Sequence, residues 1–250
     1  MRIALGVEYD GTSYHGWQRQ NNICTVQEKV EYALSQVAAE PISVVCAGRT
    51  DAGVHALSQV VHFDTEATRS DRAWILGTNT NLPPDIRVLW ARHTSFDFHA
   101  RFSATARQYR YIIYNNKIAS AILRHRAMWF PFPLDEKLMH EAGQYLVGEY
   151  DFSSFRGSGC QAKSAKRNVM FLTVTRNGCT VTIDIKANAF LLHMVRCIVG
   201  MLVKVGEGEK LPSWAKEILI ARDRRVSAAT APAQGLYLVG AEYGYDLSVS

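Results

Sequence analysis

The sequence lacks the motifs that mark many well-known enzyme sites. It contains no GxxxxGKS loop for phosphate, no HExxH metal pair, no GxSxG nucleophile, and no cluster of His and Cys at metal-ligand spacing. The string Gly157–Ala162 loosely matches a dinucleotide fingerprint, but it follows no apolar strand and opens no apolar helix. These motifs therefore provide no candidate site for a metal ion, a phosphate loop or a dinucleotide.

Paired cysteines and long apolar runs are also missing. The five cysteines are scattered and form no CxxC pair, which is typical of reduced thiols in a cytoplasmic protein. The most apolar stretch, Ala189–Val205, is interrupted by His193, Arg196 and Lys204, so it predicts a buried helix and not a membrane span. No secretory leader precedes the first alternating segment. The prediction is a cytoplasmic protein with no membrane partner.

The composition is that of a folded, slightly basic protein. Hydrophobic residues make up 48% of the 250 residues and charged residues 20%, which argues against disordered and fibrous classes. The formal net charge is +5 and the isoelectric point is near 9.0. This excess suits a polyanionic partner, but many basic proteins bind no nucleic acid.

The first part of the chain predicts alternating strands and helices. Thr25 and Glu28 have the spacing of a capping box at the start of a helix. The order β-α-β-β-α-β is typical of a ferredoxin-like fold. The predicted strands are Arg2–Tyr9, Ile42–Cys46, Val60–Phe63 and Ile86–Ala91, and the predicted helices are Val26–Val37 and Ser70–Leu76.

The second part resembles the first in element order and carries an extra helix. We place the boundary loosely in Phe96–Ala106, which gives two halves at residues 1–100 and 101–250. The prediction is an α/β (α+β) fold of two ferredoxin-like halves with a mixed, mainly antiparallel sheet. The predicted strands are Arg107–Tyr114, Val169–Thr175, Thr180–Lys186 and Leu236–Tyr243, and the helices are Leu134–Leu146, Ala189–Val205 and Pro212–Ile220.

The most informative run is AGRTDAGVHA at residues 47–56. It sets Arg49 and Asp51 between two glycines, which let the chain turn tightly and let a nucleotide approach the backbone. Asp beside Gly is most often a turn former or helix cap, and the run alone favours that interpretation. The nearby arginine and His55 raise the alternative that Asp51 is catalytic.

A second run interleaves arginine with tyrosine. Aromatic rings stack on splayed bases while guanidinium groups hold phosphates, so such interleaving suits an RNA surface. The alternative is an amphipathic strand with aromatic core residues, and for Tyr111 the two interpretations are evenly balanced. The residues are Arg101, Arg107 and Arg110 with Tyr109, Tyr111 and Tyr114.

Two further segments carry notable cations. Arg196 lies in the apolar stretch, where burial predicts a carboxylate partner, while His193 is more often a satisfied core or helix-start residue. Lys163 and Lys166 stand in a Gly/Ser-rich loop where contact with phosphate is plausible. A third basic group, from Arg222 to Arg225, looks like a solvated helix end.

Seven segments together resemble the tRNA pseudouridine synthase A family, from the first strand to the last. The resemblance implies a homodimer, a two-half fold with a central active-site cleft, and conversion of uridines 38, 39 and 40 in the tRNA anticodon stem-loop. It implies no cofactor. The segments are YDGTSYHGWQRQ (9–20), AGRTDAGVHA (47–56), NLPPDI (81–86), FHARFSATARQYRY (98–111), DFSSFR (151–156), KANAFLLHMVR (186–196) and GLYLV (235–239).

The same resemblance implies roles for five residues. Asp51 matches the catalytic aspartate, and Arg196 the arginine that pairs with it. Tyr109 matches the active-site tyrosine and Arg49 an RNA-contacting arginine. Leu236 lies in the apolar wall of the site. Among the cations, Arg101, Arg107, Arg110, Lys163 and Lys166 are expected to contact RNA.

Several alternatives stay open on the sequence. Asp51 could attack C1′ of the ribose, attack C6 of the base, or remove a sugar proton. The rival functions are a synthase with another uridine target, a non-catalytic RNA-binding or RNA-chaperone protein, and a glycosylase that releases free uracil.

Overall fold

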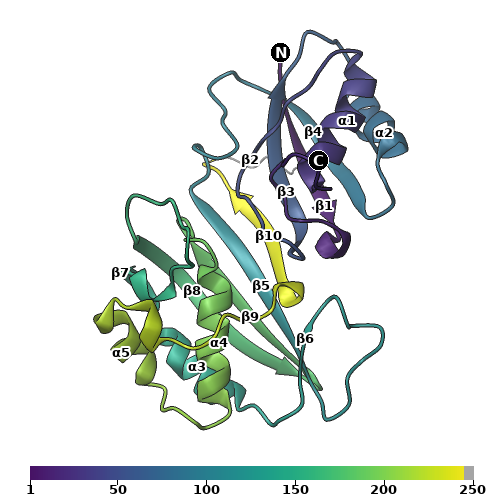
Figure 1. The fold of residues 1–250 in the computed structure, drawn as a ribbon. Coiled ribbons are helices and arrows are strands. Elements are labelled where there is room, and N and C mark those ends of the chain that lie inside the picture. Colours follow the sequence, from purple (N-terminus) through teal and green to yellow (C-terminus); the bar gives the residue numbers. More distant parts are fainter. Residues whose placement is uncertain (245–250) are drawn as a thin grey trace. The chain divides into compact units, whose positions relative to one another are not determined.

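The computed structural model describes residues 1–244; the last six residues, 245–250, which the predicted second half includes, lie outside the described part. The described part contains ten strands and five α-helices. They fall into two compact units (Figure 1). Unit 1 comprises residues 1–107 and the chain from Tyr237 onward, and unit 2 comprises Gln108–Leu236.

Unit 1 is built on a sheet in the order β4-β1-β3-β10, with β2 paired to β3. Strand β1 pairs antiparallel with β3 and β4, whereas β10 runs parallel to β3. Helices α1 and α2 pack against each other, and α2 also packs against β4 (Figure 1). The predicted β-α-β-β-α-β order and the mixed sheet are confirmed. The elements are β1 (Arg2–Tyr9), α1 (Val26–Ala38), β2 (Val45–Cys46), β3 (His55–Asp64), α2 (Asp71–Asn81), β4 (Ile86–Thr94) and β10 (Leu236–Glu242).

Unit 2 has a sheet in the order β5-β9-β8-β7, with β6 parallel to β5. Strand β8 pairs antiparallel with both β7 and β9. The three helices lie over one face of this sheet, where α3 packs on β8 and α4 (Figure 1). The elements are β5 (Ala106–Asn115), β6 (Met128–Phe130), α3 (Glu136–Gln144), β7 (Gly148–Asp151), β8 (Lys166–Asn177), β9 (Thr180–Ala187), α4 (Met194–Gly206) and α5 (Trp214–Ala221).

The final strand clusters with unit 1, although the sequence placed it in the second half. It belongs to unit 1 because it pairs with β3, where Tyr237 and Leu238 lie opposite His55 and Ala56. The ring of Tyr237 also stacks on His55, with centroids 4.7 Å apart. Unit 1 is thus completed by a segment distant in sequence.

Two predictions about the first helix and the strand after it are wrong. The Thr25 hydroxyl caps no amide of α1 among the described residues. Instead Val26 N and Gln27 N donate to carbonyls of the preceding loop. The strand predicted from Ile42 shortens to Val45–Cys46, because Val44 N donates to the Glu31 carboxylate of α1 at 3.1 Å rather than to a strand.

The apolar helix predicted at Ala189–Val205 begins later than predicted. Helix α4 starts at Met194 and not at Ala189, because His193 adopts a left-handed conformation with φ of 59°. The Asn188 side chain accepts from Ala189 N at 2.8 Å, which stabilises a turn in place of a helical start. The segment before α4 is therefore a loop.

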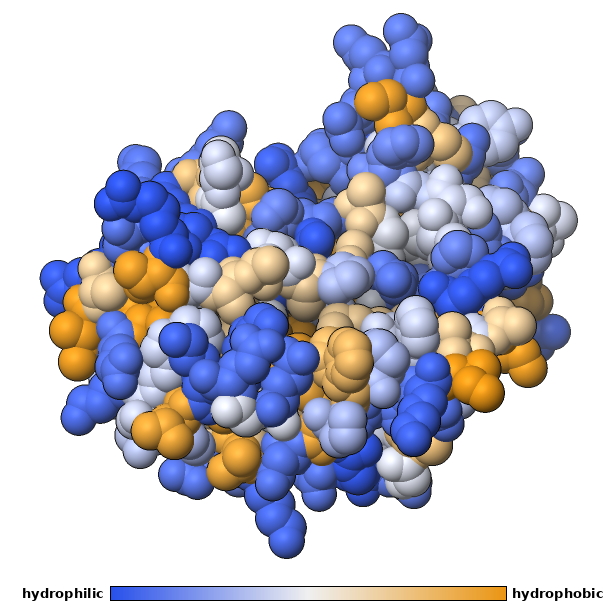
Figure 2. All heavy atoms as spheres, turned by 60° about the horizontal axis from the view of Figure 1, so that its bottom comes forward, coloured by the Kyte–Doolittle hydropathy of each residue, from blue (hydrophilic) through white to orange (hydrophobic). Residues whose placement is uncertain are grey.

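The surface in Figure 2 is mostly polar, with apolar residues gathered in several separate patches. Within residues 1–244, no helix is both long and apolar enough to cross a bilayer. The core of unit 1 includes Trp17, Trp74 and Phe63, and that of unit 2 includes Tyr111 and Phe155, all less than 2% exposed. Each unit therefore has its own large buried side chains.

Candidate active site

Residues 47–54 form the loop between β2 and β3, and the backbone of this loop is fixed on both sides. Ala47 N donates to Val60 O at 2.8 Å, and Gly48 exchanges two hydrogen bonds with the Gln59 side chain, which is fully buried. These hydrogen bonds to residues of β3 leave the backbone of the loop little conformational freedom. The Asp51 region is therefore held in one conformation before any substrate arrives.

One other segment quoted from the sequence contacts this loop directly, and the NLPPDI segment in turn contacts that one. The Thr50 hydroxyl bonds to the Tyr9 hydroxyl at 2.7 Å inside the core. The Thr50 carbonyl accepts from Trp17 N at 3.0 Å, and Gly53 N donates to Tyr14 O at 3.3 Å. The structure thus brings the YDGTSYHGWQRQ segment against the GRTD run.

The NLPPDI segment joins the same cluster through Asp85. The Tyr14 hydroxyl donates to Asp85 Oδ1 at 2.7 Å, and Asp10 N donates to Asp85 O at 2.9 Å. Burial and this hydrogen bond raise the pKa of Tyr14 well above its usual range, so the hydroxyl stays protonated. Sequence reasoning assigned no role to Tyr14 or Asp85, and both support the loop.

Asp51 stands at the first position of a tight turn. Its carbonyl accepts from Val54 N at 3.1 Å, and Gly53 has φ of 75°, a conformation that favours glycine. The turn is therefore closed by backbone atoms of Asp51. The Asp51 side chain is partly exposed and Arg49 is exposed. An accessible carboxylate and an accessible guanidinium are both suited to contact a nucleotide.

His55 of this segment and Cys46, the residue before it, are reactive side chain types with structural environments. Nδ1 of His55 lies 3.0 Å from Gly11 N, which donates to it, and 3.1 Å from Asp10 Oδ1. His55 is buried and joins the first loop to β3. Burial raises the pKa of the Cys46 thiol to about 11, so it is protonated at neutral pH. Neither residue has the environment of a nucleophile.

In unit 2 the tyrosines of β5 have distinct environments. Tyr109 is mostly buried, and the ring of Phe190 meets it edge to face at 5.0 Å. Tyr111 is fully buried and donates to Pro232 O at 2.8 Å. A Cβ at Gly235 would lie 2.7 Å from the Tyr111 ring, so glycine is required there. Tyr111 is therefore a core residue, which decides between its two interpretations.

Arg196 lies in the first turn of α4 and is partly exposed. Its Nε donates to Ala231 O at 2.8 Å, and its own carbonyl accepts from Ala231 N at 3.0 Å. The guanidinium is thus oriented by the segment that leads to β10. The neighbouring His193 is the residue before the helix, and Leu236 is a buried residue at the start of β10.

The predicted RNA-contacting cations divide into two groups. Arg107 donates to the carbonyls of Ala47, Ala104 and Arg101. Arg110 forms a two-pronged ion pair with Asp184, at 2.9 and 3.2 Å. The guanidinium groups of these two arginines therefore bind protein atoms. In contrast, Arg101, Lys163 and Lys166 are exposed.

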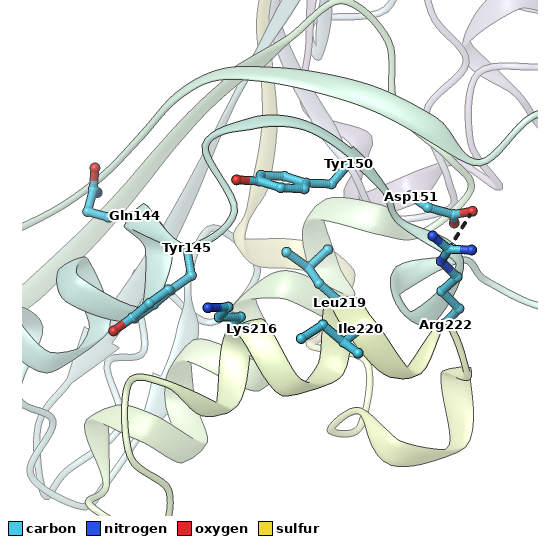
Figure 3. Close-up of a pocket in the computed structure, with 8 residues that line it drawn as sticks. All are labelled: Gln144, Tyr145, Tyr150, Asp151, Lys216, Leu219, Ile220 and Arg222. Carbon is cyan, nitrogen blue, oxygen red and sulfur yellow. Dashed lines mark ion pairs between the residues drawn. The ribbon is translucent and has the colours of Figure 1, made fainter.

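A cavity of about 460 Å³ lies in unit 2, between the end of α3, β7 and α5 (Figure 3). It contains none of the predicted site residues. Arg222 and Asp151 in its lining form an ion pair at 4.0 Å (Figure 3). The Asp151 carboxylate also accepts from the amide and hydroxyl of Ser153. The cavity is lined by Gln144, Tyr145, Tyr150, Asp151, Lys216, Leu219, Ile220 and Arg222.

The described residues include no group of three or more His, Cys, Asp or Glu side chains placed to hold a metal ion. The candidate residues are distributed over both units. Arg49, Asp51 and Arg101 belong to unit 1, whereas Tyr109, Arg196 and Lys163 belong to unit 2. Each unit thus contributes its own part of the predicted machinery.

Comparison with known proteins finds full-length relatives. A family model described as tRNA pseudouridine synthase matches residues 6–103 and 142–244. A tRNA pseudouridine synthase A from Klebsiella pneumoniae is 59% identical over 250 residues, covering 99% of this chain and 93% of that protein. The protein of the same name from Citrobacter koseri is 60% identical over 242 residues, covering 97% and 90%. One from Aliivibrio fischeri is 58% identical over 243 residues, covering 97% and 93%.

Proposed function

This chain belongs to the tRNA pseudouridine synthase family, an isomerase family, and we propose that it converts uridines 38, 39 and 40 of the tRNA anticodon stem-loop to pseudouridine with Asp51 as the essential catalytic residue. The observation that carries the proposal is the Asp51 loop, whose backbone is fixed by two other segments while Asp51 itself is partly exposed. Rigid support with an accessible carboxylate is what a reaction on a bound nucleotide requires.

The reaction is an isomerisation and needs no energy source. The bond between N1 and C1′ breaks, the base turns, and a bond forms between C5 and C1′. The C5 proton leaves and N1 gains a proton, so atoms and charge balance. Asp51 acts on the nucleotide by attacking C1′, by attacking C6, or by removing a sugar proton. All three routes use one carboxylate and no cofactor.

Three residues assist Asp51 in this proposal. Arg196 supplies a positive charge as the partner of the carboxylate, and the orientation of its guanidinium by Ala231 supports that role. Tyr109 stacks on the target base and places a hydroxyl near C5. Arg49, which is exposed, fills the space left by a uridine extruded from the stem, an event that costs a few kcal/mol, on the order of one stacking interaction. Leu236 contributes an apolar wall.

The remaining contacts are to the RNA backbone. Exposed Arg101, Lys163 and Lys166 are suited to bind phosphates directly. Arg107 and Arg110 remain proposed contacts, although their guanidinium groups also bind protein atoms. The resemblance to the family further supports a homodimer that works in the cytoplasm.

The test is mass spectrometry of tRNA after chemical labelling of pseudouridine, with and without the protein. We expect labelled residues at positions 38, 39 and 40, and none when each uridine is replaced by cytidine. Modification elsewhere would assign another target uridine. Free uracil in solution would indicate a glycosylase, and unmodified RNA with tight binding would indicate a non-catalytic RNA-binding protein.

A further inference from the structure

The segment Phe98–Ser103 in unit 1 exposes an aromatic ring that the catalytic proposal does not use. Phe102 is 75% exposed, one of the most exposed large apolar side chains of unit 1. Its neighbour Arg101 is also exposed, and the Arg101 guanidinium carbon lies 5.5 Å from the centre of the Phe102 ring. A phenylalanine ring exposed beside a cation can bind a ligand that has both a flat apolar face and a negative charge.

The ring of Phe102 ends a column of rings that rises from the core. His62 on β3 is 4% exposed, and its centroid lies 4.8 Å from that of His99. His99 in turn stacks on Phe102, with centroids 4.3 Å apart and planes inclined by 29°. Burial, together with the positive charge of Arg2, lowers the pKa of His62 to about 4. The base of the column is thus a neutral, buried ring.

The backbone of the segment is fixed by the same two histidines. His62 Nδ1 accepts from Ala100 N at 3.1 Å. His99 Nδ1 accepts from the amides of both Arg101 and Phe102 at 3.2 Å. The exposed ring is therefore positioned in advance, so little conformational entropy is lost when a ligand covers it.

Arg107 connects this column to the catalytic loop. Its guanidinium donates to Arg101 O on one side and to Ala47 O, at 3.0 Å, on the other. Ala47 begins the loop that carries Arg49 and Asp51. A group bound on Phe102 would therefore lie beside the same loop, within unit 1.

We propose that Phe102 and Arg101 form a stacking subsite for an unpaired nucleobase of the RNA, distinct from the uridine that reacts. This inference rests on the proposed function, because it takes RNA as the ligand. A nucleobase has a flat π-face for the phenyl ring or the guanidinium plane, and its phosphate attracts the cation. One fixed aromatic ring flanked by a cation suits a base better than it suits the larger apolar patch of a protein partner.

The experiment measures binding of an anticodon stem-loop RNA that carries the fluorescent base 2-aminopurine at one unpaired position at a time. With the wild-type protein we expect quenching at one position other than the target, because stacking quenches this base. Phe102→Ala should abolish that quenching and raise Kd about tenfold or more, whereas Phe102→Trp should keep both. Phe96→Ala is the matched control, since Phe96 is 66% exposed in the same unit.

Three results would overturn the inference: a wild-type Kd for Phe102→Ala, quenching at no position other than the target, or an equal loss for Phe96→Ala. Thermal unfolding of each variant shows that the protein is folded. Pseudouridine formation by the wild type on the same RNA is measured in parallel. If that activity is present while Phe102→Ala binds normally, the subsite is absent and the proposed function stands. If it is missing, the proposed function itself fails.

Discussion

The two units hold their candidate RNA-facing loops by different means. In unit 1 the loop at residues 47–54 is fixed mainly by backbone hydrogen bonds and by the buried pair of Tyr9 and Thr50, and a single guanidinium, that of Arg107, also donates to Ala47 O. In unit 2 the segment from Gly157 to Ala165 is braced by guanidinium groups, because Arg156 donates to Cys160 O and Ala162 O, and Arg167 donates to Ser164 O.

This difference matches the work proposed for each loop. A loop fixed through its own backbone holds its side chains within narrow limits, which an aligned attack on a nucleotide requires. A loop braced by two arginines leaves Lys163 exposed, and Lys166 at the start of β8 is also exposed, which suits contact with phosphates at variable distance. Changes in the unit 1 loop at residues 47–54 should therefore affect turnover, and changes in the unit 2 loop should affect affinity.

Arg196 is the main exception to the assignment of turnover to unit 1 and affinity to unit 2. It lies in unit 2 but is proposed to act on the catalytic carboxylate. Arg196→Met keeps helix propensity and removes the charge, so we expect turnover to fall by about two orders of magnitude or more. Arg196→Lys, which keeps the charge, should retain part of the rate. Single-turnover kinetics measure both variants, and a wild-type rate for Arg196→Met would show that Asp51 does not depend on it.

Variants of Tyr109 sharpen the comparison, because the hydroxyl is proposed to act in catalysis and the ring in binding. Tyr109→Phe keeps the ring against Phe190 and loses the hydroxyl, so Kd for tRNA should stay near the wild-type value while kcat falls about 10²-fold. Tyr109→Leu should impair both quantities. Wild-type turnover by the Phe variant would remove the hydroxyl from the mechanism and leave the stacking role.

The loop of unit 2 should influence affinity alone. Replacing Lys163 and Lys166 together by Gln should weaken tRNA binding several-fold and reduce the slope of log affinity against log salt by roughly 1 to 2. Lys137→Gln, on the exposed face of α3, serves as the control for loss of charge. An unchanged salt slope in the double variant would mean that these lysines do not contact phosphate.

A separate effect concerns the stability of unit 1 at low pH. Burial lowers the pKa of His62 from 6.5 to about 4, while Arg2, His99 and Asp64 are the charged or titratable groups that act on it. The unfolded chain therefore takes up the proton first, so stability present above pH 6.5 is lost as the pH falls toward 4. We expect a loss on the order of 2 kcal/mol.

His62→Gln keeps an acceptor for Ala100 N but does not titrate. The difference between the variant and the wild type in free energy of unfolding should therefore shrink as the pH falls from 7 to 4. Urea unfolding at several pH values measures this difference. Parallel curves would show that His62 titrates normally in the folded protein.

The sequence predicted the elements with strong patterns and missed those set by tertiary contacts. The strand predicted at Arg2–Tyr9 is confirmed, although residues 3–7 are all buried and do not alternate, and the helix predicted from Ser70 is confirmed with the Ser70 side chain as its cap. The edge strands β6 and β7 are only three and four residues long, too short to show a period. The late start of α4 depends on the left-handed His193, which no pattern of apolar residues reveals.

The same limit applies to the site. The GRTD run could be singled out because glycine, arginine and aspartate, placed side by side, rarely belong to a hydrophobic core. Which arginines bind protein atoms could not be predicted, since Arg110 pairs with Asp184 from a strand 74 residues away. Phe102 was missed because one exposed ring in a short loop has no sequence signature. Its proposed role follows only from its stacking on His99, which the structure shows.

The central claim is that Asp51 acts directly on the nucleotide, and single-turnover pseudouridine formation by Asp51→Asn and Asp51→Glu with excess enzyme tests it most directly. Asn keeps the shape but loses the charge and the nucleophilic oxygen, and Glu displaces the charge by one methylene. We expect both variants to bind tRNA about as well as the wild type and to form no detectable pseudouridine. Substantial pseudouridine from well-folded Asp51→Asn would contradict the mechanism, and loss of binding together with activity would assign Asp51 to the turn alone.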